Sequence, residues 1–112
     1  MEGTIPERSV IVSESFKEHR KDIYAFGLET FGYFQAEKYV QQIKQSLETL
    51  SSYYNVYPEC RHLATKKRTY RNIILDAHLI IYRITGERIE VLDIIHSTSS
   101  IRKIQATKKI KI

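Results

Sequence analysis

Residues 69–100 hold three apolar runs separated by only two short polar breaks. The runs read TYRNIIL, HLIIYRI and RIEVLDIIHS, and the breaks between them read DA and TGE. Each run has the length and the β-branched content of a strand, and breaks this short leave room only for tight hairpins. The segment therefore predicts an antiparallel meander of three strands, and the rest of the fold must be built around it.

Side chains of the middle run alternate between two faces of the predicted sheet. One face takes His78, Ile80, Tyr82 and Ile84, and the other takes Leu79, Ile81 and Arg83. Neither face is wholly polar, so we expect one face to be covered by helices and the other to be partly exposed.

The half of the chain before the meander has a helical pattern. The stretch SVIVS at 9–13 predicts a short strand, and Ser15 with Glu18 has the spacing of a capping box, which predicts a helix over about 15–31. Apolar residues that recur along this helix are Phe16, Ile23, Phe26 and Phe31. After Gly32, a second buried face is formed by Ala36, Tyr39, Val40, Ile43, Leu47 and Leu50. The two helices form a hairpin whose apolar face must cover the sheet.

A chain of 112 residues is long enough for one hydrophobic core, so we expect a single domain over 9–100. Its class is α+β, with an N-terminal strand, a two-helix hairpin and an antiparallel β-sheet. Residues 1–8 are expected to be flexible. Residues 101–112 follow Ser100 and read IRKIQATKKIKI. We expect them to be a basic tail or a loosely held last strand. With that last strand, the order of elements is β, α, α, β, β, β, β.

Positive charge is concentrated in the second half of the chain. Residues 1–60 hold 6 Lys or Arg against 9 Asp or Glu, a net charge of −3, whereas residues 61–112 hold 12 against 4, a net charge of +8. A basic half suits an acidic partner such as nucleic acid, an enzyme that handles nucleic acid or an acidic protein segment. A merely soluble, lysine-rich surface would give the same counts, so both interpretations stay open at this point.

Several classes of protein are disfavoured by what the sequence lacks. No apolar run approaches the roughly 18 residues of a membrane span, and the start MEGTIPERSV does not resemble a secretory signal. Cys60 is alone, which favours a reducing cytoplasm. The histidines and Cys60 have no metal-ligand spacing, and phosphate loops and nucleophile signatures are absent, so we expect neither a metal nor a cofactor.

The order of these segments is similar to that of a known family. AEKYVQQIKQSLETL, a proline loop and then YRNIILDAHLIIYRITGERIEVLDIIHS together resemble the RelE/ParE superfamily of type II toxin–antitoxin toxins, and within it the ParE branch, over roughly residues 9–100. The resemblance implies two helices packed on a twisted antiparallel sheet. This chain departs from the pattern at His19 and Arg20, where relatives often have Asp-Leu, and at STSSI, which follows His96.

The superfamily contains two kinds of toxin. RelE-like members cut messenger RNA in the ribosome, and ParE-like members act on DNA gyrase without known hydrolytic chemistry. RNA cleavage needs a base, cations and an acid that converge on one phosphate. Leu79 stands where RelE-like patterns have a strand arginine, and no tyrosine follows the last strand. The sequence therefore predicts a non-enzymatic toxin that poisons DNA gyrase by binding and is neutralised by a cognate antitoxin.

Charge and expected exposure select the residues for contact with the target or the antitoxin: Arg68, Arg71, Arg83, His96, Arg102 and Lys103. The polar side chains weighed for catalysis are Arg61, His62, Tyr70, Arg71, His78, Arg83 and His96. Each of these has a structural interpretation as a turn, strand or rim residue.

Two alternatives stay open. The first is a ribosome-dependent messenger RNA endoribonuclease of the RelE kind that uses Arg71, His78 and His96. The second is a degenerate toxin that serves only as a binding scaffold or repressor partner. The altered STSSI segment after His96 supports this alternative. The sequence also leaves open a homodimer and a toxin–antitoxin hetero-oligomer.

Overall fold

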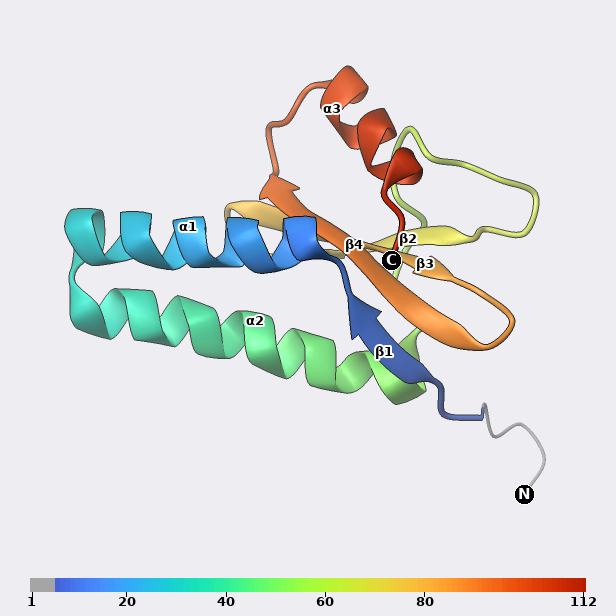
Figure 1. Cartoon of the computed structure of the whole chain (residues 1–112), viewed down its shortest axis with the longest axis horizontal. Coiled ribbons are helices and arrows are strands. Elements are labelled where there is room, and N and C mark those ends of the chain that lie inside the picture. Colours follow the sequence, from blue (N-terminus) through green and yellow to red (C-terminus); the bar gives the residue numbers. More distant parts are fainter. Residues whose placement is uncertain (1–5) are drawn as a thin grey trace.

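The α+β fold class that the sequence predicts is confirmed by a computed structural model, which describes residues 6–112 (Figure 1). The elements are β1 (Ser9–Val12), α1 (Glu14–Phe31), α2 (Tyr33–Tyr53), β2 (Tyr70–Ile74), β3 (His78–Ile84), β4 (Arg88–His96), α3 (Ile101–Ala106) and the 3₁₀ helix η1 (Thr107–Lys109). Helices α1 and α2 form a hairpin that packs against a twisted sheet.

The four strands of the sheet lie in the order β1-β4-β3-β2. Strands β2, β3 and β4 form the antiparallel meander that the short polar breaks predict. Strand β1 joins the sheet next to β4 and parallel to it, with Ser9 opposite Arg88. The connection from β1 to the meander runs through the helical hairpin, and such a long crossover permits a parallel pair.

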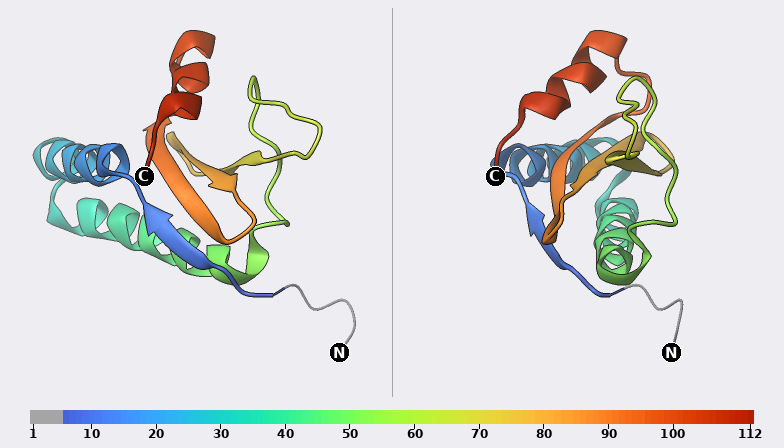
Figure 2. Two further views of the ribbon diagram at one scale, coloured as in Figure 1. Left: turned by 45° about the vertical axis from the view of Figure 1, so that its right-hand side comes forward. Right: turned by 90° about the vertical axis from the view of Figure 1, so that its right-hand side faces the viewer.

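Both faces of the sheet are covered, so the expectation of a partly exposed second face is wrong over most of its area. On one face, Phe16 of α1 and Ile43 and Leu50 of α2 pack with strand residues such as Ile80 and Tyr82. On the other face, the core contains Cys60, Leu63, Tyr70, Ile81, Leu92, Ile95 and Ile104. These come in part from α3 and from the loop before β2, which Figure 2 shows on the side of the sheet away from α2.

The C-terminal segment is helical, and the expected last strand is wrong. The side chain of Ser100 caps α3 by accepting a hydrogen bond from the backbone N–H of Lys103 at 3.2 Å. Ile104 of this helix is buried against the sheet, whereas Ile101 is 53% exposed. Residues 101–112 are therefore part of the folded domain and complete its second core.

The N-cap of the first helix lies two residues earlier than the Ser15 that the capping-box pattern predicts. Its N-cap is Ser13, whose Oγ accepts a hydrogen bond from the N–H of Phe16 at 3.0 Å and donates one to the carbonyl of Leu92 at 2.5 Å. The N–H of Ser13 also donates to the carbonyl of Val91 at 2.9 Å. Ser13 is preferred over Ser15 because it reaches both the helix and β4, at the point where the β3–β4 register shifts.

Gly27 of α1 lies close to α2, because an added Cβ atom there would lie 3.3 Å from the Cβ of Ala36. The turn between the helices is Gly32, whose φ of 89° suits a residue without a side chain. Beyond these contacts, the closed end of the hairpin extends past the sheet (Figure 1). Phe26 and Phe31, which the sequence pattern assigns to the buried face, are therefore 63% and 66% exposed.

Residues 6–8, for which the sequence predicts flexibility, contact the end of α2. The hydroxyl of Tyr54 donates to the carbonyl of Pro6 at 2.9 Å, and the N–H of Arg8 donates to the carbonyl of Ser51 at 3.1 Å. Residues 1–5, which share that prediction, lie outside the described part of the chain. None of the described helices is long and apolar enough to cross a membrane.

Candidate partner-binding surface

Arg71 of β2 holds the loop that follows α2. Its Nη1 donates to the carbonyls of Asn55 at 2.7 Å and Tyr57 at 3.0 Å, and its Nε donates to the carbonyl of Arg68 at 3.2 Å. Carbonyls at and beyond a helix C-terminus lack helical partners, and a guanidinium satisfies them well. The predicted contact residue Arg71 therefore has most of its hydrogen-bonding capacity directed into its own chain.

Arg83 of β3 joins the sheet to the C-terminal segment. Its Nε and Nη2 donate to Oε1 of Glu90 on β4 at 2.8 and 2.6 Å, and Nη2 also donates to the carbonyl of Ile110 at 3.3 Å. Burial raises the pKa of Glu90, but its hydrogen bonds to Arg83 and Arg88 outweigh that effect and leave the pKa below the usual range. Only 19% of the Arg83 side chain is exposed, so Arg83 offers a partner little surface.

His78 and His96 face each other across β3 and β4, with ring centroids 5.4 Å apart. Nδ1 of His78 also pairs with the hydroxyl of Tyr39 on α2 at 2.7 Å, and Nδ1 of His96 pairs with Oγ1 of Thr98 at 2.7 Å. Burial lowers the pKa of His78, and the charge of His96 lowers it further. This His78 cluster is the main group of interacting imidazole and phenol side chains between residues 6 and 112.

The remaining predicted contact residues lie on exposed parts of the second face. Arg102 and Lys103 are exposed on α3, and Arg68 is exposed in the loop before β2, where it has a positive φ of 53° and lies 3.8 Å from Glu59. Both segments cover the same face of the sheet, and we call the exposed cations that they carry the basic surface. Its exposed members are Arg61, Lys66, Lys67, Arg68, Arg102, Lys103, Lys108 and Lys109.

A hollow of about 350 Å³ opens on this face, between the loop before β2, the edge of β2 and the start of α3. It is lined by Pro58, Glu59, Arg61, His62, Asn72, Ile74, Leu79, Ser97, Ser99 and Ile104. The sequence analysis considered Arg61 and His62 only for catalysis and did not identify this group. No local pattern reveals it, because its members come from four separate segments.

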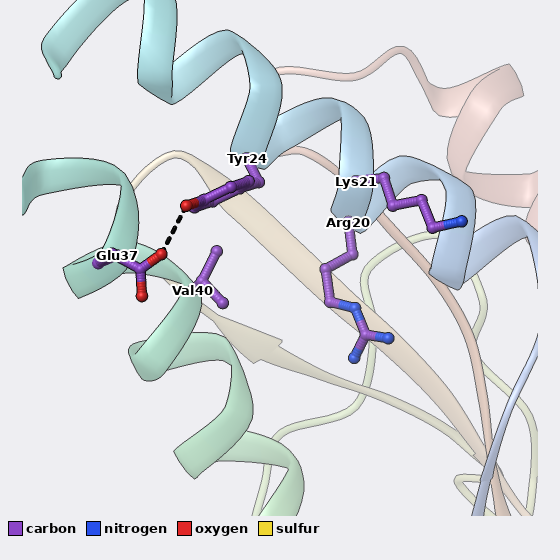
Figure 3. A pocket seen from close by; sticks show the side chains of 5 residues that line it. All are labelled: Arg20, Lys21, Tyr24, Glu37 and Val40. Atoms are coloured by element: carbon purple, nitrogen blue, oxygen red, sulfur yellow. Dashed lines mark hydrogen bonds between the residues drawn. The ribbon is translucent and has the colours of Figure 1, made fainter. Parts of the chain in front are cut away.

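A second hollow, of about 360 Å³, lies between α1 and α2 and is shown in Figure 3. Arg20, Lys21 and Tyr24 line it from α1, and Glu37 and Val40 line it from α2. The hydroxyl of Tyr24 donates to Oε2 of Glu37 at 2.5 Å, which ties the two helices together. The contact gives this hollow a structural role in holding the hairpin.

His19 of α1, which departs from the family pattern, has a structural role. Nδ1 of His19 lies 2.6 Å from Oδ1 of Asp93, a buried residue on β4. Oδ1 of Asp93 also accepts the N–H of Ile94 at 2.8 Å. The pair thus anchors α1 beside β4, just beyond the end of β1.

An aromatic cluster of Phe26, Phe31, Tyr33 and Phe34 lies exposed at the closed end of the hairpin. Phe34 is 85% exposed, and it packs edge-to-face with Tyr33, as Phe26 does with Phe31. Apolar periodicity did not reveal this cluster, because the same spacing describes a buried helix face. Among residues 6–112, no group of His, Cys, Asp and Glu side chains is arranged to hold a metal ion.

Comparison with solved structures gives the class of fold. The chain is similar to a protein of the chromosomal ParDE toxin–antitoxin system of P. aeruginosa, with a TM-score of 0.67 and 21% sequence identity. The match covers 80% of this chain and 96% of the other. A search of curated protein sequences finds no significant match.

The sequence itself gives the family. Residues 10–100 match the family model described as the ParE toxin of the type II toxin–antitoxin system parDE. The chain therefore belongs to the ParE toxin family, as its resemblance to the ParE branch of the RelE/ParE superfamily implied. The match ends at the turn before α3, so the helical C-terminal segment lies outside it.

Proposed function

We propose that this toxin poisons DNA gyrase by binding it, without catalysing a reaction, and that a cognate antitoxin protein neutralises it. The observation that carries the proposal is the separation of the residues that RNA cleavage would need. Arg71 lies opposite Tyr82, four residues along β3 from His78, which is about 13 Å at the rise of a strand. Arg71 is also bonded to three backbone carbonyls, so it does not converge with His78 and His96 on one phosphate.

The basic surface supports recognition of an acidic partner. Its cations come from the loop before β2 and from α3 through η1, and most of them make no ion pair within residues 6–112. Such a surface speeds the approach of an acidic protein segment and aligns it, and the buried contacts then supply the affinity. The proposal places the toxin in the cytoplasm, where gyrase acts on the chromosome.

The test is a supercoiling assay with purified toxin and purified gyrase. Inhibition of supercoiling, with ribosome-bound messenger RNA left intact in a parallel assay, is the expected result. Inhibition should be relieved when the antitoxin is added first. Intact supercoiling at a large molar excess of folded toxin would refute the proposal.

A second candidate, a ribosome-dependent ribonuclease, is favoured by one observation only. Burial lowers the pKa of His78, which favours the neutral imidazole that can act as a base, and Tyr39 and His96 are adjacent. Cleavage of ribosome-bound messenger that is lost in His78→Gln and His96→Gln, but retained in Arg71→Lys, would establish this function. A messenger that stays intact with the wild-type toxin would exclude it.

A further inference from the structure

The hollow on the basic surface is lined by a buried polar atom that has no partner in the described structure. The Oγ atom of Ser99 is buried and lacks a hydrogen-bond partner among residues 6–112. Asn72, whose carboxamide can both donate and accept, lines the same hollow and is only 5% exposed. Buried polar groups are nearly always paired, so an unpaired hydroxyl in the lining of an open hollow indicates a ligand that pairs it.

Donors dominate the rest of the polar lining. The side chains of Arg61 and His62 are exposed and make no hydrogen bond within residues 6–112, and His62 has a positive φ of 69°. The one carboxylate, Glu59, already accepts the N–H of Thr65 at 3.0 Å. The site therefore suits a ligand with a negative charge at the end of the hollow that Arg61 lines.

The remaining wall is aliphatic and lies beside an open sheet edge. Ile74, which is 67% exposed, lines the hollow with Leu79 and Ile104. Strand β2 is an edge strand, and the segment 58–60 covers only part of it, through hydrogen bonds to the N–H of Asn72 and the carbonyl of Tyr70. Strand alternation then points the N–H and C=O of Ile74 away from β3, toward the free edge.

From these features we infer that the hollow and the free edge of β2 bind an extended segment of the antitoxin that carries an acidic side chain between two aliphatic ones. The segment continues the sheet by pairing with Ile74, its aliphatic side chains pack on Ile74, Leu79 and Ile104, and its carboxylate meets Arg61. Asn72 and Ser99 pair with its polar groups. The choice of the antitoxin as the source rests on the proposed function, whereas the site itself does not.

A peptide is favoured over a nucleic acid by the composition of the wall. Single-stranded bases are bound chiefly by stacking on aromatic side chains, and no phenylalanine, tyrosine or tryptophan lines this hollow in the described structure. The free edge of β2 and the carboxamide of Asn72 each offer both a donor and an acceptor. A peptide backbone can pair with both kinds of group, whereas a phosphate offers only acceptors.

The probe is the peptide Thr-Leu-Thr-Glu-Thr-Leu-Thr with blocked ends, which places Leu, Glu and Leu on one side of a strand. Its matched control has Lys in place of Glu. Titration of the full-length toxin, followed by amide NMR shifts, should move signals of Arg61, Asn72 and Ile74 with the Glu peptide and much less with the Lys peptide. Equal affinity for both peptides would overturn the inference.

Three variants locate the contacts. Arg61→Gln should weaken binding of the Glu peptide about tenfold, and Lys44→Gln, which removes an exposed cation of α2 outside both the hollow and the basic surface, should not. Ile74→Pro removes the free-edge N–H and should bind more weakly than Ile74→Ala, which keeps it. Ser99→Ala should raise the melting temperature of the free toxin, because it removes a buried hydroxyl that has no partner in the described structure. The same substitution should lower the affinity for the peptide. If Ile74→Pro does not fold, the Arg61 and Ser99 variants still test the inference.

The purified toxin–antitoxin complex should not bind the peptide, because the site is occupied. Binding to the complex as tight as to free toxin would rule out the antitoxin as the occupant. Binding of heptauridylate at the same residues, in place of the peptide, would overturn the peptide assignment. A toxin that inhibits gyrase but does not bind the peptide refutes this inference alone, and a toxin that binds the peptide but leaves gyrase active refutes only the proposed target.

Discussion

Arg83 and Glu90 lie directly opposite each other on β3 and β4, and two hydrogen bonds of 2.8 and 2.6 Å join the guanidinium to one carboxylate oxygen. Their side chains are 19% and 10% exposed, so the pair is largely removed from water. The same guanidinium also reaches the carbonyl of Ile110. One arginine thus links two strands to the end of the chain.

Arg83→Ala should lower the free energy of unfolding by about 2–3 kcal/mol, because it leaves a buried carboxylate with one cation fewer. Urea denaturation measures this change. Arg88→Ala is the matched control, because Arg88 also bonds Glu90 but is 38% exposed, and its removal should cost about 1 kcal/mol or less. Equal losses in the two variants would contradict the structural role of Arg83.

The stability of the toxin should fall as the pH drops below about 6.5, and part of that fall should come from His78. Burial and the neighbouring His96 lower the pKa of His78 in the folded state, so the unfolded state takes up its proton first. Melting temperatures measured from pH 8 to pH 5 should therefore decline less steeply in His78→Gln. A decline of equal slope in His78→Gln and in the wild type would contradict this contribution of His78.

Ser13→Ala should destabilise the fold by about 2 kcal/mol, because it removes the cap of α1 and the bond to Leu92 together. Ser15→Ala, two residues further along, should change the free energy of unfolding by less than about 0.5 kcal/mol. Chemical denaturation of both variants distinguishes the two serines. A larger effect at Ser15 would place the start of α1 where the capping-box pattern predicts it.

Cys60 should resist alkylation in the folded toxin. It is 1% exposed, and burial raises the pKa of its thiol to about 11, so almost none is thiolate at pH 8. Iodoacetamide should add no mass to the native protein and one adduct to the denatured protein, as measured by intact mass spectrometry. Rapid labelling of native toxin would show that the loop before β2 opens from the sheet.

Phe34→Ser should leave the free energy of unfolding within about 0.5 kcal/mol, because Phe34 is 85% exposed. The substitution should shorten the retention of the toxin on a hydrophobic-interaction column, since Phe34 is part of the exposed aromatic cluster. Phe16→Ala, at a fully buried position of α1, should instead cost about 3–5 kcal/mol. A large loss in Phe34→Ser would mean that the hairpin end packs against the domain.

Long periodic segments made most of the fold predictable. The meander and α2 follow from local spacing, which tertiary contacts did not override. The segment 101–112 was misassigned because its isoleucines recur at intervals that fit both a strand and a helix over so short a stretch. The choice of Ser13 over Ser15 depends on β4, almost 80 residues away, and no local pattern carries that information.

The candidate site was harder to predict than the fold. Arg71 and Arg83 alternate with apolar neighbours as surface residues would, yet their partners are backbone carbonyls from distant segments, which sequence spacing does not reveal. His78 and His96 could be paired once the hairpin register was known. The hollow beside Ile74 depends on how the loop before β2 crosses the sheet edge, and that path has no periodic signal.

The parallel pairing of Ser9 with Arg88 also determines how much of the chain must be synthesised before the sheet can fold. A sheet that joins the first strand to the last cannot close until nearly the whole chain has been synthesised, and contacts so distant in sequence form slowly. A nascent chain that stops before β4 leaves β1 and the α1 cap without their partners. Truncated translation products should therefore be harmless fragments that cellular proteases remove.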